Sequence, residues 1–153
     1  MNILSILYKL YEPLLWSQIK NGPRPHHIGL IVDGNRRFAK VNGLASNEGH
    51  DAGSQKLEDF LRWCWRLDIK IVTLYAFSTE NHKRAANEVD YLMALILKKL
   101  KQYQVDPVIR REGVKIKVIG QRENLSEEMI TEIEKTEELT KDHDRFQLNI
   151  AVS

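Results

Sequence analysis

The sequence predicts an α/β fold in which a mostly parallel sheet is flanked by helices. Short apolar runs with the composition of buried strands occur at residues 28–32, 69–77, 114–119 and 146–152. Apolar residues repeat at helical spacing over residues 53–68, 87–104 and 126–139. Strands that alternate with helices at this spacing form a parallel sheet.

A further amphipathic helix is predicted near the N-terminus, over residues 2–20. Its apolar stripe consists of Ile3, Leu7, Leu10 and Leu14. Pro13 is expected to kink or divide this helix. Because few basic residues accompany the stripe, we favour packing on the domain's own core or on a partner over peripheral contact with a membrane. The predicted organisation is a helix and linker over residues 1–25, followed by the α/β domain over residues 26–153.

Composition and charge exclude several classes of protein. The 153 residues, of which 42% are hydrophobic and 29% charged, are typical of one globular domain. The formal net charge of +2, without a basic block interleaved with aromatic residues, argues against binding of nucleic acid. Cys64 is the single cysteine, so no disulfide framework is expected, and its place on an apolar helix face predicts a buried side chain.

The sequence shows neither a secretory signal nor a membrane-spanning stretch. Lys9 interrupts the first apolar run, no small-residue cleavage site follows it, and no run of about 18 apolar residues exists. We therefore expect a cytoplasmic protein, with peripheral membrane contact through the first helix as the alternative to a purely soluble one.

The first predicted strand ends in residues that are suited to bind an anion. Asp33, Gly34, Asn35, Arg36 and Arg37 follow it directly. The arginine side chains can grip phosphate oxygens, and the glycine lets the backbone approach closely. The aspartate would repel phosphate unless a cation lay between them, and Mg2+ typically binds one or two carboxylates together with substrate phosphates. The alternative is a simple hairpin turn, although the following residues do not alternate like a returning strand.

The second predicted strand also ends in a polar cluster. This cluster consists of Ser78, Thr79, Glu80, Asn81, His82, Lys83 and Arg84. The carboxyl ends of parallel strands meet at one edge of the sheet, where open α/β sheets bind their ligands. A single polar cluster at a strand end is compatible with a solvated loop. Two polar clusters at the ends of adjacent strands predict a crevice that both strands line.

Other common site motifs are absent from the sequence. There is no P-loop, dinucleotide-binding or G-x-S-x-G motif, and the histidines lack the spacing of a zinc site. His50 and His82 are of interest because each lies near a strand-end cluster. The apolar stripe of residues 87–104 is compatible with a core-facing helix or with the wall of a hydrophobic tunnel. The lysines near the end of that helix, Lys98, Lys99 and Lys101, match its dipole.

Taken together, these segments are similar to a known family. The matching segments are residues 27–40 (HIGLIVDGNRRFAK), 48–53 (EGHDAG), 73–81 (TLYAFSTEN) and 148–151 (LNIA), with Arg84, Glu88 and Val89. They resemble the cis-prenyltransferases, which are the undecaprenyl and dehydrodolichyl diphosphate synthases, with features of the archaeal and eukaryotic branch. These enzymes add isopentenyl diphosphate to an allylic diphosphate, form a cis double bond and make long-chain polyprenyl diphosphates.

The resemblance implies roles for individual residues. Asp33 would be catalytic by holding Mg2+ against diphosphate, and Asn81 would lie by the reacting carbons, although an amide is a poor base for the proton removal often assigned to it. Substrate binding would involve Gly34, Asn35, Arg36, Arg37, Phe38, Ser46, His50, Ser78, Thr79, Glu80, His82 and Arg84. Two of these depart from the family pattern: Ser46 stands where an arginine is common, and His82 stands where an aromatic residue is usual.

The resemblance also implies that the sequence corresponds to the N-terminal part of such an enzyme. Family members continue past Asn149-Ile150-Ala151 into a Tyr-Gly-Gly-Arg segment and later residues that bind isopentenyl diphosphate and complete the metal site. We therefore expect a sheet that is incomplete at its C-terminal side, with an open edge and an uncovered core. By itself, such a chain is expected to turn over little or no isopentenyl diphosphate.

Several functional hypotheses follow. The first is a transferase that uses an allylic diphosphate of the farnesyl or geranylgeranyl type together with isopentenyl diphosphate, as a homodimer or heteromer. The alternative is a non-catalytic or partial subunit that binds diphosphate or a partner chain. Retention of Asp33, Arg37, His50 and Asn81 favours descent from a catalyst. A generic phosphate-binding module would leave the second strand-end cluster unexplained.

Overall fold

A computed structural model describes residues 3–152, with the side chains from residue 11 onward, and contains a four-stranded parallel sheet. The strands are β1 (His27–Ile31), β2 (Ile71–Phe77), β3 (Val114–Ile119) and β4 (Phe146–Val152). Their order across the sheet is β1-β2-β4-β3, and all three neighbouring pairs are parallel. The predicted α/β class is confirmed, and the two strands with polar ends are neighbours.

Helices connect these strands in the predicted order. They are α1 (Ile3–Ile19), α2 (Asn35–Val41), α3 (Ser46–Arg66), the 3-10 helix η1 (Thr79–Lys83), α4 (Ala86–Val105), α5 (Pro107–Arg111) and α6 (Glu127–Thr140). Helix α3 begins seven residues earlier than predicted, because its first two turns are polar and carry no apolar repeat. Helix α5 was not predicted; Pro107 occupies its first turn, and the Asp106 carboxylate caps it by accepting from the Val108 N–H at 2.8 Å.

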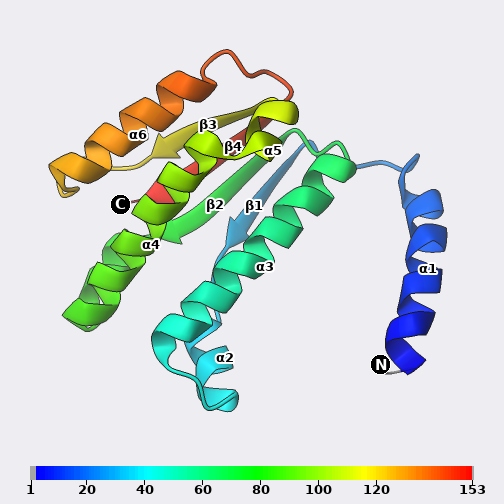
Figure 1. The fold of residues 1–153 in the computed structure, drawn as a ribbon, viewed down its shortest axis with the longest axis horizontal. Coiled ribbons are helices and arrows are strands. Elements are labelled where there is room, and N and C mark those ends of the chain that lie inside the picture. The colour runs from blue at the N-terminus through cyan, green and yellow to red at the C-terminus, as the bar shows by residue number, and fades with distance from the viewer. Residues whose placement is uncertain (1–2, 153) are drawn as a thin grey trace.

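The hydrophobic core lies on one face of the sheet, beneath α3, α4 and α6 (Figure 1). Alternate residues of neighbouring strands point into it; Val72, Leu148 and Ile116 are in register and almost fully buried. Cys64 belongs to this core with 2% of its surface exposed, and burial raises the pKa of its thiol to about 11. The prediction of a buried cysteine is confirmed.

The opposite face of the sheet is not covered by the described helices. Ile31, Tyr75 and Ile119 form an apolar row across it and are 72%, 49% and 45% exposed. A second row is polar, with Thr73 Oγ1 within 2.8 Å of His27 Nε2. The apolar composition of residues 28–32 predicts a strand buried on both faces, which is wrong for this structure: β1 alternates between exposed and partly buried residues, because the described helices cover only the other face. This bare sheet face, with its exposed apolar row, is the uncovered surface that the family resemblance led us to expect.

The edge of the sheet at β3 is protected by α6. Thr140 Oγ1 accepts a hydrogen bond from the Ile116 N–H at 3.1 Å, and Glu137 Oε1 accepts one from the Val118 N–H at 2.9 Å. Arg122 pairs with the same glutamate. These side chains occupy backbone donors that would otherwise template another strand. The expectation of an open edge is wrong at β3.

Helix α1 stands apart from the sheet (Figure 1). Its described contacts with the α/β domain include Arg66, whose guanidinium lies 4.6 Å from the Trp16 ring centroid and 3.7 Å from Glu12. Leu14 is 59% exposed, so packing on the domain's own core is wrong for the side chains described, and the predicted stripe at residues 3, 7 and 10 lies outside them. Pro13 lies within an uninterrupted helix and does not divide it. Within residues 3–152, no helix combines the length and apolar character needed to cross a bilayer.

Candidate functional site

The turn after β1 presents a carboxylate at the carboxyl end of the sheet. Gly34 adopts φ of +89°, a left-handed conformation that L side chains rarely adopt, and α2 begins at the next residue. The hairpin alternative is therefore wrong. Asp33 Oδ1 accepts a hydrogen bond from the Gly34 N–H at 2.6 Å. Within the described residues the second carboxylate oxygen, Oδ2, accepts no hydrogen bond, and the turn is exposed.

Two glycines bring α3 into close contact with α2. A Cβ atom on Gly49 would lie 2.8 Å from Ala39 Cβ and would also clash with the Asn35 carbonyl oxygen. A Cβ atom on Gly53 would collide with the Asn35 side chain. Because these glycines are four residues apart, they lie on the same face of α3. This spacing of two glycines is a signal of close helix packing that can be read from the sequence.

This close packing places His50 beside a buried carboxylate from α4. Glu88 Oε1 lies 3.2 Å from His50 Nε2 and accepts from Arg84 at 2.8 Å, while Glu88 Oε2 lies 3.7 Å from Arg36 Nε. Burial alone would raise the pKa of Glu88, but hydrogen bonds from Arg84 and His50, together with the charge of Arg36, outweigh it and hold the pKa below its usual range. Glu88 therefore anchors three basic side chains that come from three different segments.

Glu88 was not predicted as a site residue. Its place in the first turn of α4 matches the helix dipole, which is a sufficient local reason for an acid there. The contacts with His50 and Arg36 depend on how α2, α3 and α4 pack. The one indication in the sequence that Glu88 has a role in the site is that it is among the residues that carry the family resemblance.

A charged cavity of about 730 Å³ lies where these segments meet. The site residues predicted from the sequence that line it are Asp33, Gly34, Asn35, Arg36, Arg37, Ser46, His50 and Arg84. The buried Ser46 Oγ has no hydrogen-bond partner among the described residues. Arginine and histidine donors outnumber carboxylates along this wall, so the cavity favours an anionic group with several oxygens.

An apolar cavity of about 300 Å³ lies next to the charged one, between α3, α4 and the sheet. Leu57, Leu92 and Ile96 contribute to its walls, so part of the α4 stripe lines a cavity while Leu100 belongs to the core. The two cavities share the lining residues Val32, Asp33, Asn35, His50 and Arg84. A ligand with a charged head and an apolar tail can therefore occupy both.

The second strand-end cluster contributes Ser78, Glu80 and Asn81 to the apolar cavity. Asn81 Oδ1 accepts hydrogen bonds from the Ser78 backbone N–H at 2.8 Å and from the Ser78 hydroxyl at 3.2 Å. The oxygen that would have to receive a proton is thus occupied by donors of its own turn. Asn81 thus lines the apolar cavity, and its bonds to Ser78 favour a positioning role over that of a base.

Three predicted binding residues line neither cavity. Phe38 lies on α2 and is 49% exposed, and Thr79 is exposed at the start of η1. His82 is exposed and packs edge-on against Phe77, with ring centroids 4.9 Å apart. These three residues lie outside both cavities, and their contact with substrate stays a prediction.

The chain has clear relatives among known proteins. The family model for undecaprenyl diphosphate synthase matches residues 31–153. A tritrans,polycis-undecaprenyl-diphosphate synthase (geranylgeranyl-diphosphate specific) of Thermoplasma volcanium is 45% identical over 96% of this chain and 57% of its own length. A protein of the same name from Archaeoglobus fulgidus is 44% identical over 97% of this chain and 59% of its own length. The chain thus spans less than two thirds of these relatives.

A solved structure has the same fold. It is lavandulyl diphosphate synthase from Lavandula x intermedia in complex with dimethylallyl diphosphate, which is 28% identical with a TM-score of 0.78. The match covers 84% of this chain and 54% of that one.

Proposed function

The chain belongs to the undecaprenyl diphosphate synthase family, and from that membership we propose that it carries the allylic-diphosphate site of a cis-prenyltransferase. The reaction would join isopentenyl diphosphate to an allylic diphosphate of the farnesyl or geranylgeranyl type, with a cis double bond. The observation that carries the proposal is the charged cavity that shares its mouth with an apolar one. That pair matches a diphosphate head attached to a hydrocarbon tail.

The basic side chains would do most of the work on the diphosphate. As the bond between the allylic carbon and oxygen breaks, negative charge grows on the leaving diphosphate. Arg36, Arg37, Arg84 and His50 line the site where that charge develops, and donors already in place there stabilise it without reorganisation. Glu88 keeps three of these four side chains oriented toward the cavity.

The residues present suit a magnesium ion. In the described part of the chain, no three His, Cys, Asp or Glu side chains are grouped to hold a metal by themselves. Mg2+ needs only one or two carboxylates when substrate phosphates supply further oxygens, and Asp33 offers a free Oδ2 beside the charged cavity. When bound there, Mg2+ would supply a Lewis acid for the leaving diphosphate.

Assembly and location are also part of the proposal. The exposed apolar row on the uncovered sheet face favours assembly as a homodimer or heteromer. We also propose a cytoplasmic location, and the exposed apolar side chains Tyr11, Leu14 and Ile19 of α1 support peripheral contact with a membrane. Sedimentation equilibrium tests the first statement, and flotation of the chain with lipid vesicles tests the second; a strictly monomeric or non-floating chain would contradict each in turn.

Binding of an allylic diphosphate tests the function directly. Calorimetric titration of geranylgeranyl diphosphate, with and without Mg2+, is compared with titration of geranylgeraniol and of inorganic pyrophosphate. We expect the diphosphate ester to bind more tightly than either half, and Mg2+ to strengthen its binding. Equal affinity for the alcohol and the ester, or no binding of either, would contradict the proposal.

The transferase step separates the two main hypotheses. Radiolabelled isopentenyl diphosphate is incubated with the same protein, farnesyl or geranylgeranyl diphosphate and Mg2+. Incorporation into longer prenyl products identifies a catalyst. Tight binding of the allylic diphosphate without incorporation identifies the alternative, a diphosphate-binding or partial subunit.

A further inference from the structure

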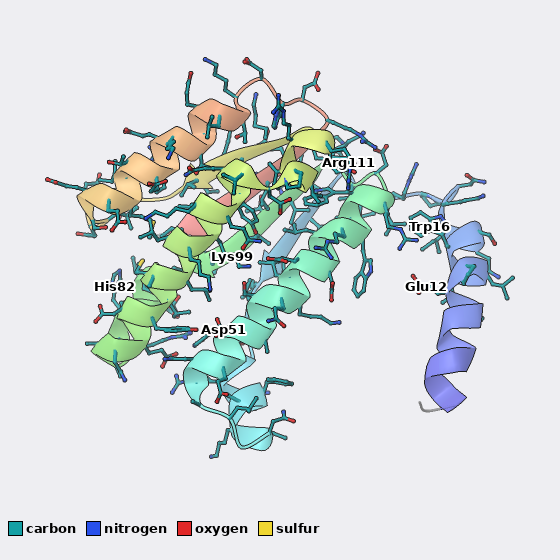
Figure 2. All side chains as sticks on the ribbon, viewed as in Figure 1. Glu12, Trp16, Asp51, His82, Lys99 and Arg111 are labelled. Atoms are coloured by element: carbon teal, nitrogen blue, oxygen red, sulfur yellow. The ribbon has the colours of Figure 1, made fainter. Side chains whose placement is uncertain are left out.

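A second charged cavity, which we call the basic edge cavity, lies where the strands of the sheet begin. Its volume is about 450 Å³. Residues at or next to the first residue of every strand line it: His26, Ile71, Lys115 and Phe146. The candidate functional site lies at the other edge of the sheet, roughly 20 Å away along the seven residues of β2. Figure 2 shows Arg111 at the edge where the strands begin, and Asp51 and His82 at the edge where they end.

Basic side chains predominate along the wall of this cavity. The basic residues among its described lining are His26, Lys70, Lys115, His143 and Arg145. The described lining includes a single acidic residue, Asp144. These residues come from four segments that the parallel sheet brings together. A chain with a formal net charge of only +2 can therefore gather positive charge here without a basic block in its sequence.

Two cations of the basic edge cavity lie against the ring of Phe146. Lys70 Nζ is 5.2 Å from the ring centroid, and the guanidinium carbon of Arg145 is 5.0 Å from it. Lys70 also donates to Asp68 Oδ1 at 2.5 Å. Arg145 donates to Glu112 Oε2 at 2.9 Å. Neither of these carboxylates lines the cavity, so they hold the two cations from outside it.

His143 is also held in a defined orientation. Its Nδ1 lies 2.9 Å from the Val114 carbonyl oxygen. Because a carbonyl oxygen only accepts hydrogen bonds, Nδ1 carries a proton, and Nε2 is the ring atom that can meet a ligand. Lys115 approaches from the bare sheet face, in register with Gln147, which also lines the cavity. The lining thus presents side chains whose positions the fold has already fixed.

The electrostatic field at this edge is positive. The hydrogen bond from Lys70 is the largest cause that lowers the pKa of the Asp68 carboxyl. Desolvation opposes it, and the charges of Lys70, Arg24 and Arg145 lower the pKa further. One carboxylate therefore lies in the field of three cations, and positive charge is left over for a ligand.

We propose that the basic edge cavity is a second anion site, which binds a small soluble molecule that bears a phosphate group. Lysine and arginine are the side chains that bind phosphate oxygens best. The volume lies within the roughly 300–1,000 Å³ of small-molecule pockets. A cation is not the ligand, because no three His, Cys, Asp or Glu side chains of the described residues are grouped to hold a metal. A small molecule suits basic groups that line a cavity better than a flat bilayer does.

Titration of the 15N-labelled 153-residue chain with inorganic phosphate tests the inference by NMR. The experiment is run at low ionic strength, because salt screens such sites. We expect saturable shifts of the amide signals of residues 143–147, Lys70 and Lys115. Sodium chloride at the same ionic strength should not produce them. Arg37→Ala, which changes the candidate functional site, should leave the phosphate affinity read from these signals unchanged.

A pair of double variants separates the cavity from overall charge. Lys70→Met with Lys115→Met should weaken phosphate binding at the edge about tenfold, because two charged donors are lost. Lys98→Met with Lys135→Met removes the same charge from exposed positions on α4 and α6 that do not line the cavity, and should leave the affinity unchanged. The dispersion of the amide signals shows whether each variant is folded.

A third variant should act in the opposite direction. Asp68 has a φ of 59°, in the left-handed region that asparagine tolerates, so Asp68→Asn keeps the local backbone. It removes the carboxylate that competes for Lys70, and phosphate should bind about threefold more tightly. Weaker binding to Asp68→Asn would contradict the inference, whether or not the double variant folds.

The remaining outcomes also decide the inference. Shifts at the edge that do not saturate, or an equal loss of affinity in the two double variants, would show only a general attraction of charge and would overturn it. Flotation with phosphatidic acid vesicles that depends on Lys70 and Lys115, without saturable phosphate shifts, would identify a lipid contact and would also overturn it. Failure of allylic diphosphate binding at the other edge leaves the inference untouched.

Discussion

The charged and the apolar cavities are built by different means, although they share a mouth. The charged cavity is lined by a turn, a short helix and the polar start of α3, and two glycines bring these pieces together. The apolar cavity is lined by regular elements, mainly the facing stripes of α3 and α4 over the sheet. Under the proposed function, the first would bind the charged head through a few placed donors, and the second would bind the apolar tail through surface area. The comparison teaches that head and tail recognition can be disturbed separately.

The largest effect is expected from the carboxylate beneath the charged cavity. Glu88→Gln removes the charge that His50, Arg84 and Arg36 share, and we expect it to lower the free energy of unfolding by about 2–3 kcal/mol. Urea unfolding at neutral pH measures this. The exposed Glu128→Gln serves as the matched control, with a change of at most about 0.5 kcal/mol.

The same carboxylate predicts a pH dependence of stability. The pKa of Glu88 in the folded chain lies below its ordinary value of 4.5, so the folded state favours the charged form. Its stabilisation is present above pH 4.5 and is lost as the pH falls through the lowered folded-state pKa. The difference in stability between wild type and Glu88→Gln should therefore shrink as the pH falls below 4.5, and a difference that grows on acidification would contradict this.

The next effect concerns the packing that assembles the charged cavity. Gly49→Ala would press a methyl group against Asn35 and Ala39, and we expect a net loss of about 1–2 kcal/mol even though alanine favours the helix. Diphosphate binding should weaken in parallel. Gly29→Ala in β1 is the control, because a Cβ atom there meets nothing within 4 Å. Thermal unfolding and calorimetry of both variants test the prediction; equal losses would sink it.

A smaller effect, specific to the head, is expected from Arg37. This side chain is exposed and lines the charged cavity, so Arg37→Ala should weaken binding of geranylgeranyl diphosphate about tenfold while leaving stability unchanged. Binding of pyrophosphate should fall by a similar factor and binding of geranylgeraniol should not. Arg110→Ala, on the exposed face of α5, is the control. Weaker binding of the alcohol would show that head and tail sites are coupled.

The smallest effect is specific to the tail. Leu92→Gln places a polar group on the wall of the apolar cavity, and we expect geranylgeranyl diphosphate to bind about fivefold more weakly because less apolar area is buried. Pyrophosphate, which has no tail, should bind as it does to the wild type. Leu139→Gln, which changes an exposed leucine on α6, is the control. An equal loss of pyrophosphate affinity would break the distinction between the two cavities.

Much of the charged cavity was predictable because its residues are contiguous. Asp33 to Arg37 follow one strand directly, so the end of that strand defines where they lie, and Arg84 follows the neighbouring strand in the same way. Phe38 and His82 belong to the same two clusters but line neither cavity, so their contact with substrate stays a prediction. Position along the chain places a residue near a site, but the local turn decides where its side chain points.

The buried partners could not be predicted, because they depend on contacts between distant segments. His50 and Glu88 are separated by 38 residues, and Lys99 and Glu58 by 41. Glu88 and Lys99 each match the dipole of their own helix, and this local reason gave no sign of a distant partner. Local patterns therefore concealed both ion pairs.

The sequence by itself determined the strands, most of the helices and the polar clusters at the strand ends, because hydrophobic period and turn chemistry act over a few residues. Only the tertiary structure decided that the helices leave one sheet face bare, that Glu88 collects three basic groups, and that Lys99 turns inward to Glu58. The physical reason is that burial and ion pairing depend on which surfaces meet, and that is set by packing across the whole chain.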